Sequence, residues 1–345
     1  MKEPLVSVII VTYNSVNYLK SCLNSILSTE YKNLEIIIVD NKSNDDTTSI
    51  IKSFKDKVNP FFIDKNLGYA GGNNLGVSKA KGEYIFFLNP DTLVTEDIFK
   101  FLVESLDSNS QLAVAQPAVY LMNDHKILNL TGKIINFLGF DWVRDYHKKL
   151  LPDQGEIMSF SGCGVMIKKS AFLQAKGFDE NYFMYYEDSD LSWKLRLLGY
   201  KLLFVPQAIM YHDYKYIPVE SYQPLKKKLF FNERNRLVTI YKNYSTKTLL
   251  LLLPAIVILE VCMLTFSLLN GWFLEKVKGY MSIINMSNDL NNNRLFIQEN
   301  RKLTDKQITS DYVSELNLDI YNSSIVRLFI NPFLFFYWTF VKRLI

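Results

Sequence analysis

From about residue 6 to about residue 120, short apolar runs alternate with amphipathic stretches, and this alternation constrains the fold more than any other feature. The apolar runs lie at residues 6–11, 34–39, 60–63 and 84–88. Each run is nearly all apolar, as expected for strands that are covered on both faces. The stretches at 17–27 and 45–54 have helical spacing and capping residues. The pattern therefore predicts an α/β fold with a mostly parallel sheet and flanking helices.

The next part of the chain has a weaker pattern. Residues 121–158 are expected to form loops with short strands, and they are a candidate region for substrate recognition. A strand is predicted at 160–167, a short helix at 189–198 and a further strand at 201–205. Gly199 follows the helix and can adopt the left-handed conformation that ends many helices.

After about residue 215 the sequence becomes basic and then strongly apolar. Residues 249–269 are about long enough to cross a hydrocarbon core. Pro254 and Glu260 interrupt this run, and a carboxylate at mid-bilayer costs about 2.5 to 3.5 kcal/mol on insertion scales. A spanning helix and a half-buried or paired helix therefore both remain open.

A second apolar stretch at residues 328–341 is rich in Phe and is flanked by Arg and Lys. It is too short to span straight, so it suggests an interfacial helix, with a core helix packed on the catalytic domain as the alternative. The predicted organisation is a catalytic domain at 1–215, a basic linker helix at 216–247 and a membrane-associating helical region at 248–345. The expected location is the cytoplasmic face of the cell membrane, either peripheral or with a single span.

Net charge and cysteine spacing give no sign of a nucleic-acid-binding protein or of a disulfide framework. The net charge of +4 is too small to indicate nucleic acid binding. Cys22, Cys163 and Cys262 show no pairing or metal-binding spacing, so they are expected to be buried thiols of a reducing compartment.

Polar residues follow the first two predicted strands. Thr12, Tyr13 and Asn14 come after the first strand, and Asp40 stands at the tip of the second. Ligands of open α/β sheets bind at the carboxyl ends of strands, where a carboxylate can accept from a base or a ribose. These residues are therefore candidates for nucleoside binding. The alternative is local capping, by Asn14 or Ser15 in the first turn and by Asp45 and Asp46 in the second.

A glycine-rich segment runs from Asn66 to Gly76. Its glycines can let the backbone approach a ligand closely, and Asn66, Gly72 and Asn74 are predicted donor-binding residues. The segment has neither the G-x-G-x-x-G spacing of dinucleotide folds nor the Lys-Ser/Thr ending of a P-loop.

The strand at 84–88 ends in Asn89-Pro90-Asp91, which places a lone carboxylate at the same edge of the sheet. Such a group suits Mg²⁺ or Mn²⁺, which prefer oxygen ligands and commonly bridge carboxylates to phosphates. Further along, Asp188 precedes a predicted helix whose positive end favours an ionised carboxylate. Acidic first turns also occur simply as caps, and a single histidine such as His212 is more often structural than a ligand.

In combination, these segments resemble glycosyltransferase family 2, the inverting enzymes with the GT-A fold, and in particular its rhamnosyltransferase-like branch. Asn89-Pro90-Asp91 is similar to the Asp-x-Asp metal motif of the family, with the first Asp replaced. The resemblance implies that Asp91 and His212 bind the metal and that Asp188 is the catalytic base, with Glu187 beside it orienting the acidic loop. Asn89 would belong to the donor site.

The resemblance implies an inverting transfer of a sugar from a nucleotide diphosphate donor, of the dTDP-rhamnose or UDP-hexose type. The expected acceptor is a hydroxyl of a lipid-linked glycan or polysaccharide. A sugar nucleotidyltransferase is one alternative, although its basic Gly-rich loop is missing. The other is a catalytically silent, membrane-tethered subunit that binds a nucleotide sugar or a glycan.

Overall fold

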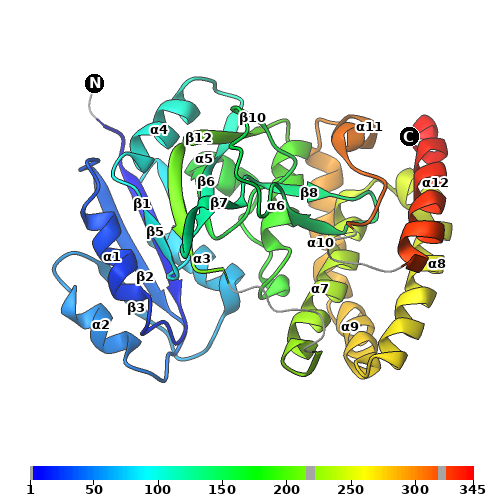
Figure 1. Ribbon diagram of the computed structural model, residues 1–345, viewed down its shortest axis with the longest axis horizontal. Helices are drawn as coiled ribbons and strands as arrows, with labels where there is room; N and C mark the ends of the chain where they lie inside the picture. The colour runs from blue at the N-terminus through cyan, green and yellow to red at the C-terminus, as the bar shows by residue number, and fades with distance from the viewer. Residues whose placement is uncertain (1–2, 215–221, 318–323) are drawn as a thin grey trace. The chain divides into compact units, whose positions relative to one another are not determined.

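The computed structural model describes residues 3–214, 222–317 and 324–345 (Figure 1). The chain divides into two compact units. The first consists of the described residues up to Lys133, of Val143–Leu195 and of residues 200–214. The second consists of Ile134–Trp142, of Arg196–Gly199 and of the described residues from 222 onward. The domain boundary predicted at residues 215 and 216 lies outside the described residues.

The first unit is built on a ten-stranded mixed sheet. Eight of its strands follow the order β10-β12-β6-β11-β4-β1-β2-β3, while β5 pairs with β12 and β7 pairs with β6. Strands β4, β1, β2 and β3 are mutually parallel, as are β6 and β12, while β11 runs antiparallel between β4 and β6. The predicted mixed, mostly parallel sheet with flanking helices is confirmed. The strands are β1 (Val6–Thr12), β2 (Leu34–Asp40), β3 (Asn59–Phe62), β4 (Tyr84–Leu88), β5 (Thr92–Val94), β6 (Leu112–Leu121), β7 (Asp124–Leu130), β10 (Gly155–Glu156), β11 (Gly164–Lys168) and β12 (Lys201–His212).

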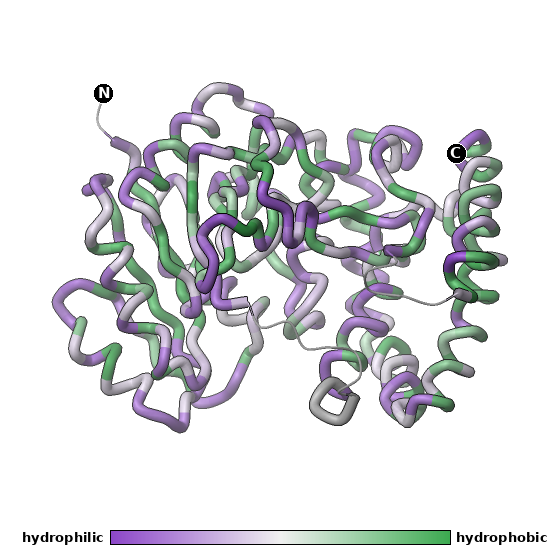
Figure 2. Tube along the Cα trace, in the orientation of Figure 1, coloured by the Kyte–Doolittle hydropathy of each residue, from purple (hydrophilic) through white to green (hydrophobic). Residues whose placement is uncertain are grey.

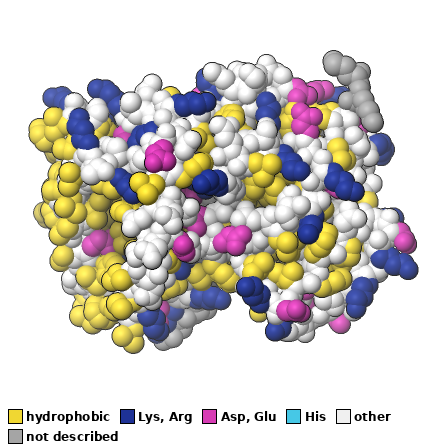
Figure 3. Space-filling view, turned by 180° about the vertical axis from the view of Figure 1, so that it is seen from behind, with side chains coloured by type: hydrophobic (Ala, Val, Ile, Leu, Met, Phe, Trp, Pro, Cys, Tyr) yellow, Lys and Arg dark blue, Asp and Glu magenta, His cyan; other side chains and the backbone are white. Residues whose placement is uncertain are grey.

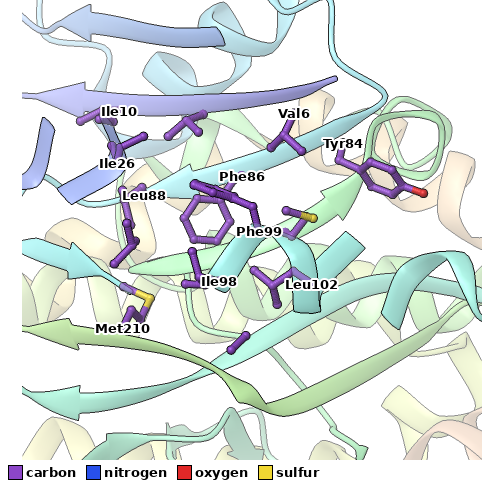
Figure 4. Close-up of a cluster of buried hydrophobic side chains, with 14 of the residues drawn as sticks. Val6, Ile10, Ile26, Tyr84, Phe86, Leu88, Ile98, Phe99, Leu102 and Met210 are labelled. Atoms are coloured by element: carbon purple, nitrogen blue, oxygen red, sulfur yellow. The ribbon is translucent and has the colours of Figure 1, made fainter. Parts of the chain in front are cut away.

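Helices pack on both faces of this sheet. They are α1 (Leu19–Leu27), α2 (Thr47–Ser53), α3 (Gly68–Lys79), α4 (Ile98–Asp107), α5 (Lys169–Gln174) and α6 (Glu187–Leu197). A short pair, β8 (Lys133–Ile135) and β9 (Asp141–Val143), forms a separate two-stranded sheet. The largest apolar cluster lies between β1, β4 and the helices α1 and α4, where Phe86 meets Phe99 edge to face at 5.2 Å (Figure 4). Burial of such aromatic pairs is a major source of core stability.

Two element boundaries differ from the predicted ones. The strand predicted at 160–167 begins at Gly164, because the backbone N–H of Phe160 and that of Ser161 donate to side chains outside the ladder. The helix predicted from Ser189 begins at Glu187, which brings the acidic pair into its first turn. Gly199 has φ +90° and ends this helix as expected.

Helix α3 packs directly on β1 through its glycines. A Cβ atom on Gly72 would lie 2.7 Å from Cγ1 of Val11, and one on Gly76 would overlap the Ile9 side chain. Close packing on β1 therefore explains why Gly72 and Gly76 lack side chains, while the predicted donor contact of Gly72 stays a prediction. Their missing side chains face the sheet.

We therefore expect Gly76→Val to lower the free energy of unfolding by about 1 to 3 kcal/mol, because extra methyl groups must displace a packed core side chain. Gly155→Val is the matched control, since a Cβ atom there meets no atom within 4 Å. Chemical denaturation of both variants measures the difference. Equal losses in the two variants would contradict the packing account.

The second unit contains the C-terminal helices α7 (Tyr222–Asn243), α8 (Thr246–Leu269), α9 (Phe273–Asn285), α10 (Ser287–Asn300), α11 (Asp305–Ile308) and α12 (Asn331–Leu344). A π-helical turn at Val326–Ile330 leads into α12. Trp338 of α12 stacks on Phe137 with ring centroids 4.7 Å apart. Buried Asn331 fixes the start of α12 by bonding both the N–H and the carbonyl of Leu316.

Helix α8 carries Glu260 on the face that packs against α7 and α9. The carboxylate forms an ion pair with Arg236 of α7 and another with Lys276 of α9, at 2.7 Å for Lys276, and it accepts from the hydroxyl of Tyr280 at 2.6 Å. Cys262 lies on the opposite, exposed side of α8. The prediction that all three cysteines are buried is thus wrong for Cys262, while burial raises the pKa of Cys22 and that of Cys163 to about 12.

Candidate active site

The carboxyl ends of β1 and β2 bring the first set of predicted residues together. Thr12 and Asp40 are register partners, and the Thr12 hydroxyl donates to the buried Asp40 carboxylate at 2.8 Å. The hydroxyl of Ser43 donates to the same carboxylate oxygen at 2.6 Å. Asp40 is therefore held rigidly at the strand tip. Tyr13 beside it is half exposed, which leaves its ring face accessible.

The residues after β1 do not cap a helix. Helix α1 begins at Leu19 without a side-chain cap. Asn14 instead adopts φ 53° and accepts from the backbone N–H of Asn44, which joins the loop after β1 to the loop after β2. The capping alternative for Asn14 is therefore wrong. Asp45 does accept from the N–H of Thr47 at the start of α2, at 3.0 Å.

Two asparagines of the glycine-rich segment serve the local structure. Asn66 accepts from the N–H of Gly68 at 2.8 Å, which shapes the turn into α3. The side chain of Asn74 donates to the carbonyl of Phe178 at 2.9 Å and accepts from its N–H at 3.1 Å. These bonds clamp Asn74 to Phe178, and its predicted donor contact stays a prediction.

Asp91 and His212 lie together at the carboxyl end of β4. The strand β5 pairs with β12 so that Thr92 is opposite His212, and Nε2 of His212 is 3.6 Å from Oδ1 of Asp91. Nδ1 of His212 lies 2.9 Å from Oδ1 of Asn129, an oxygen that can only accept a hydrogen bond. In a tautomer that donates from Nδ1 to this oxygen, Nε2 presents its lone pair toward Asp91.

Asp91 and His212 therefore offer two lone-pair donors, a carboxylate oxygen and a ring nitrogen, to one cation position. Within the described residues, the buried Oδ1 atom of Asp91 has no hydrogen-bond partner. No third His, Cys, Asp or Glu from that part of the chain joins the two to complete a cation site. A carboxylate oxygen and a neutral imidazole nitrogen fit a divalent cation whose other ligands come from phosphates and water.

Asp188 is held at the start of α6 by contacts that sequence reasoning missed. Its Oδ1 atom accepts from Nζ of Lys133 at 2.7 Å and from the N–H of Ser189 at 2.8 Å. Its Oδ2 atom accepts from the N–H of Gly162 at 3.1 Å, the one bond to that atom from any residue that the structure describes. A carboxylate oxygen accepts two hydrogen bonds, so Oδ2 retains capacity for a proton.

Gly162 connects the acidic helix to the rest of the site. Its carbonyl accepts from the Tyr69 hydroxyl of α3 at 2.6 Å, and the carbonyl of the next residue, Cys163, accepts from the N–H of Asn89 at 2.9 Å. Burial, together with the charges of Glu187 and Asp188, raises the pKa of Tyr69 well above its ordinary value. Tyr69 thus stays a donor. The segment before β11 consequently joins the Asn89-Pro90-Asp91 turn to Asp188.

The backbone just before the acidic pair is strained. Phe183, Tyr185 and Tyr186 all have φ between 65° and 70°, a region that bulky residues rarely adopt. Such strain persists where the surroundings enforce it, and it is concentrated at functional sites. It sets the direction in which the chain enters α6, and no sequence pattern signals it.

A mixed sheet with carboxylates at the ends of β2 and β4 and at the start of α6 is the GT-A arrangement, and the solved structures agree. GalNAc-T7 bound to UDP, GalNAc and Mn²⁺ covers 69% of this chain and 48% of its own, with TM-score 0.58 and 19% identity. Staphylococcus aureus TarS 1-349 bound to UDP-GlcNAc covers 98% of this chain and 90% of its own, with TM-score 0.54 and 17% identity. At these identities the likeness shows the fold alone.

Sequence comparison points to the same family. Residues 7–174, slightly less than half of the chain, match the family described as glycosyl transferase family 2. The chain is 31% identical over 206 residues to the poly-beta-1,6-N-acetyl-D-glucosamine synthase of Staphylococcus epidermidis, over 59% of this chain and 48% of that protein. The corresponding synthase of Staphylococcus aureus is 28% identical over the same length. The chain thus spans about half the length of these curated relatives.

Proposed function

We propose that this chain transfers one sugar from a nucleotide diphosphate donor to a hydroxyl of a polysaccharide or lipid-linked glycan, with inversion at the anomeric carbon. The observation that carries the proposal is the segment Ser161–Cys163, which ties the Asp91 turn and the Asp188 carboxylate into one site. An acceptor hydroxyl and a donor diphosphate could then be bound at once, which is what a direct displacement needs.

The proposed reaction needs a side chain that accepts the proton of the acceptor hydroxyl. The acceptor oxygen attacks C1 of the donor sugar, the bond from C1 to the diphosphate oxygen breaks, and Oδ2 of Asp188 takes the hydroxyl proton. Lys133 and Gly162 hold that carboxylate in position, and Tyr69 holds Gly162. One displacement inverts the anomeric carbon.

Asp91 and His212 are the proposed ligands of a Mg²⁺ or Mn²⁺ ion. When bound, such an ion offsets the negative charge that develops on the departing diphosphate. Tyr13 and Asp40 are proposed to contact the nucleoside, the first by stacking and the second by accepting from the base or the ribose. Asn89 and Thr12 support them from the ends of β4 and β1.

The nature of the curated relatives favours a UDP-linked amino sugar as the donor. Their names give N-acetyl-D-glucosamine as the transferred unit, and the TarS structure contains UDP-GlcNAc. We therefore place UDP-N-acetylglucosamine ahead of dTDP-rhamnose. A polysaccharide or lipid-linked acceptor would locate the reaction at the cytoplasmic face of the cell membrane.

The test is nucleotide release from a panel of sugar donors, with Mn²⁺ or Mg²⁺ and a lipid extract or an oligosaccharide as acceptor. We expect release from UDP-N-acetylglucosamine that depends on the acceptor. Release from dTDP-rhamnose alone would overturn the donor assignment. Donor binding without release under any acceptor would instead favour a catalytically silent binding subunit.

Chelation tests the proposed metal site. We expect a chelator to abolish release and His212→Gln to raise the Mn²⁺ concentration needed for half-maximal rate by about 10- to 100-fold, the usual range for disturbed metal sites. Binding of Mn²⁺ with UDP, followed by electron paramagnetic resonance, measures the same loss without turnover. His125→Gln is the control, because His125 stacks on Tyr211 and is not a proposed ligand. Equal effects of both substitutions would contradict the assignment.

A further inference from the structure

The second unit presents an apolar surface formed by one side of α8 and one side of α12. The exposed large apolar residues of α8 are distributed along the whole helix: Leu250, Leu253, Val257, Ile258, Val261, Phe266, Leu268 and Leu269. Those of α12 and the turn before it are Leu328, Phe329, Phe333, Phe335, Phe336, Phe340 and Leu344. Figure 3 shows hydrophobic side chains gathered over this flank.

The two helices form one continuous face. The Tyr337 hydroxyl donates to the carbonyl of Leu251 at 2.6 Å, which brings the middle of α12 against the N-terminal half of α8. Both helices are hydrophobic over most of their length in Figure 2. Of the helices in the described parts of the chain, α8 is the one long and apolar enough to cross a membrane by length and composition.

The other side of α8 is anchored to polar helices. Glu260 is paired with Arg236 of α7 and with Lys276 of α9, and both of these cations have side chains that are nearly fully buried. Arg236 also donates to the carbonyl of Leu138 and lies over the ring of Phe140. A helix that crossed a bilayer alone would have to leave these partners. The Glu260 carboxylate would then lack a counter-charge, and the two buried cations would share the one carboxylate of Glu233.

The charges at the edge of the apolar face are positive. Lys247 lies at the start of α8, and Lys342 and Arg343 lie at the end of α12. Lys342 donates to the carbonyl of Ser310, and nearby Asp305 accepts from the N–H of Ser245 just before α8, so these cations lie at the same end of the helix pair. A protein interface of this size would be expected to contain polar residues among the apolar ones. A largely apolar face with few polar side chains, such as Thr265 and Thr339, and with cations at its edge instead matches the hydrocarbon boundary and headgroups of an anionic bilayer.

From these observations we infer that α8 and α12 dock on an anionic lipid bilayer with both helix axes parallel to the membrane plane, so that α8 enters one leaflet without crossing. The occupant of this surface is therefore lipid rather than a second copy of the chain. The inference is independent of sugar transfer, since a chain without activity would dock in the same way.

Binding is tested by flotation of the full chain with vesicles of phosphatidylcholine, alone or in an equimolar mixture with phosphatidylglycerol. We expect Leu253→Ser combined with Phe336→Ser to lower the partition coefficient by at least about tenfold, because two apolar side chains no longer leave water. Arg343→Gln should lower it about fivefold on the anionic vesicles only. Leu150→Ser, at an 83% exposed leucine of the first unit, is the matched control and should have no effect.

Depth measurements distinguish docking from spanning. In a Cys262→Ser background, single substitutions Leu250→Cys, Val257→Cys and Leu268→Cys each receive a fluorophore, and nitroxide lipids with the label at different depths quench it. Similar shallow depths at all three sites are the expected result. A deep position for Val257→Cys with shallow positions at the two ends would overturn the inference in favour of a span. A lack of vesicle binding, with or without a concentration-dependent dimer, would also overturn it.

Discussion

Asp188→Asn should lower the rate of sugar transfer by about 10³-fold while the donor still binds. General-base catalysis contributes between about 10² and 10⁴ in rate, and the amide cannot take up the acceptor proton. The amide is nearly the same size as the carboxylate, and its oxygen can still accept from Lys133 or Ser189, so the start of α6 should keep its shape. Acceptor-dependent nucleotide release and the dissociation constant for UDP-N-acetylglucosamine measure the two quantities.

The loss must be separated from a structural effect, because Gly162 would face an amide donor in the variant. Thermal unfolding of the variant reports any such loss. Asp124→Asn, at an exposed carboxylate of β7, is the control for removal of one charge. If Asp188→Asn transferred sugar at the rate of Asp124→Asn, the proposed base would be wrong. If it lost donor binding and stability together, Asp188 would be a structural residue.

Glu260→Gln should lower the free energy of unfolding of the second unit by about 3 kcal/mol, since it leaves the two buried cations Arg236 and Lys276 to share the single carboxylate of Glu233. Burial by itself would raise the pKa of Glu260, but the charges of Arg236 and Lys276 outweigh it and lower the pKa from 4.5 to about 2. Denaturation of wild type and variant, followed by hydrogen exchange of α8 amides, measures the difference. Glu275→Gln is the control, because its 4.0 Å pair with Lys278 is at the surface and contributes little.

The same ion pairs predict a pH dependence. A carboxyl group whose folded pKa is depressed contributes stability that is complete above its unfolded pKa and is lost as the pH falls through the folded value. The stability difference between wild type and Glu260→Gln should therefore be constant above about pH 5 and should shrink between about pH 4.5 and pH 2. A difference that does not change over this interval would show that the carboxylate is not stabilised by its neighbours.

Much of the first unit follows from local patterns in the sequence. The apolar runs at β1, β2 and β4 specify buried parallel strands by composition alone, because each strand must be covered on both faces. The residues that follow them then lie at one edge of the sheet, since the strands run in the same direction. Asp40 and Asp91 could therefore be placed before the structure was known, and so could the left-handed Gly199 that ends α6.

Contacts between distant parts of the chain could not be placed in this way. Lys133 reaches Asp188 across 55 residues, and Gly162 joins Asp188 to Tyr69, without any repeat or spacing that marks them in advance. The sequence of α3 does not indicate whether its glycines pack on β1 or let the backbone approach a ligand. Only the side-chain volumes of Ile9 and Val11 decide between the two.

The C-terminal region shows most clearly which features follow from the sequence and which depend on tertiary contacts. The sequence by itself determined that residues 249–269 form a long apolar helix and that Glu260 is an expensive group in a bilayer. Whether that helix stands alone or packs was decided by the tertiary structure, which supplies Arg236 from 24 residues upstream and Lys276 from the next helix. Composition sets the solvent that a helix prefers on average, but the cost of one buried charge depends on partners that only the folded chain brings within reach.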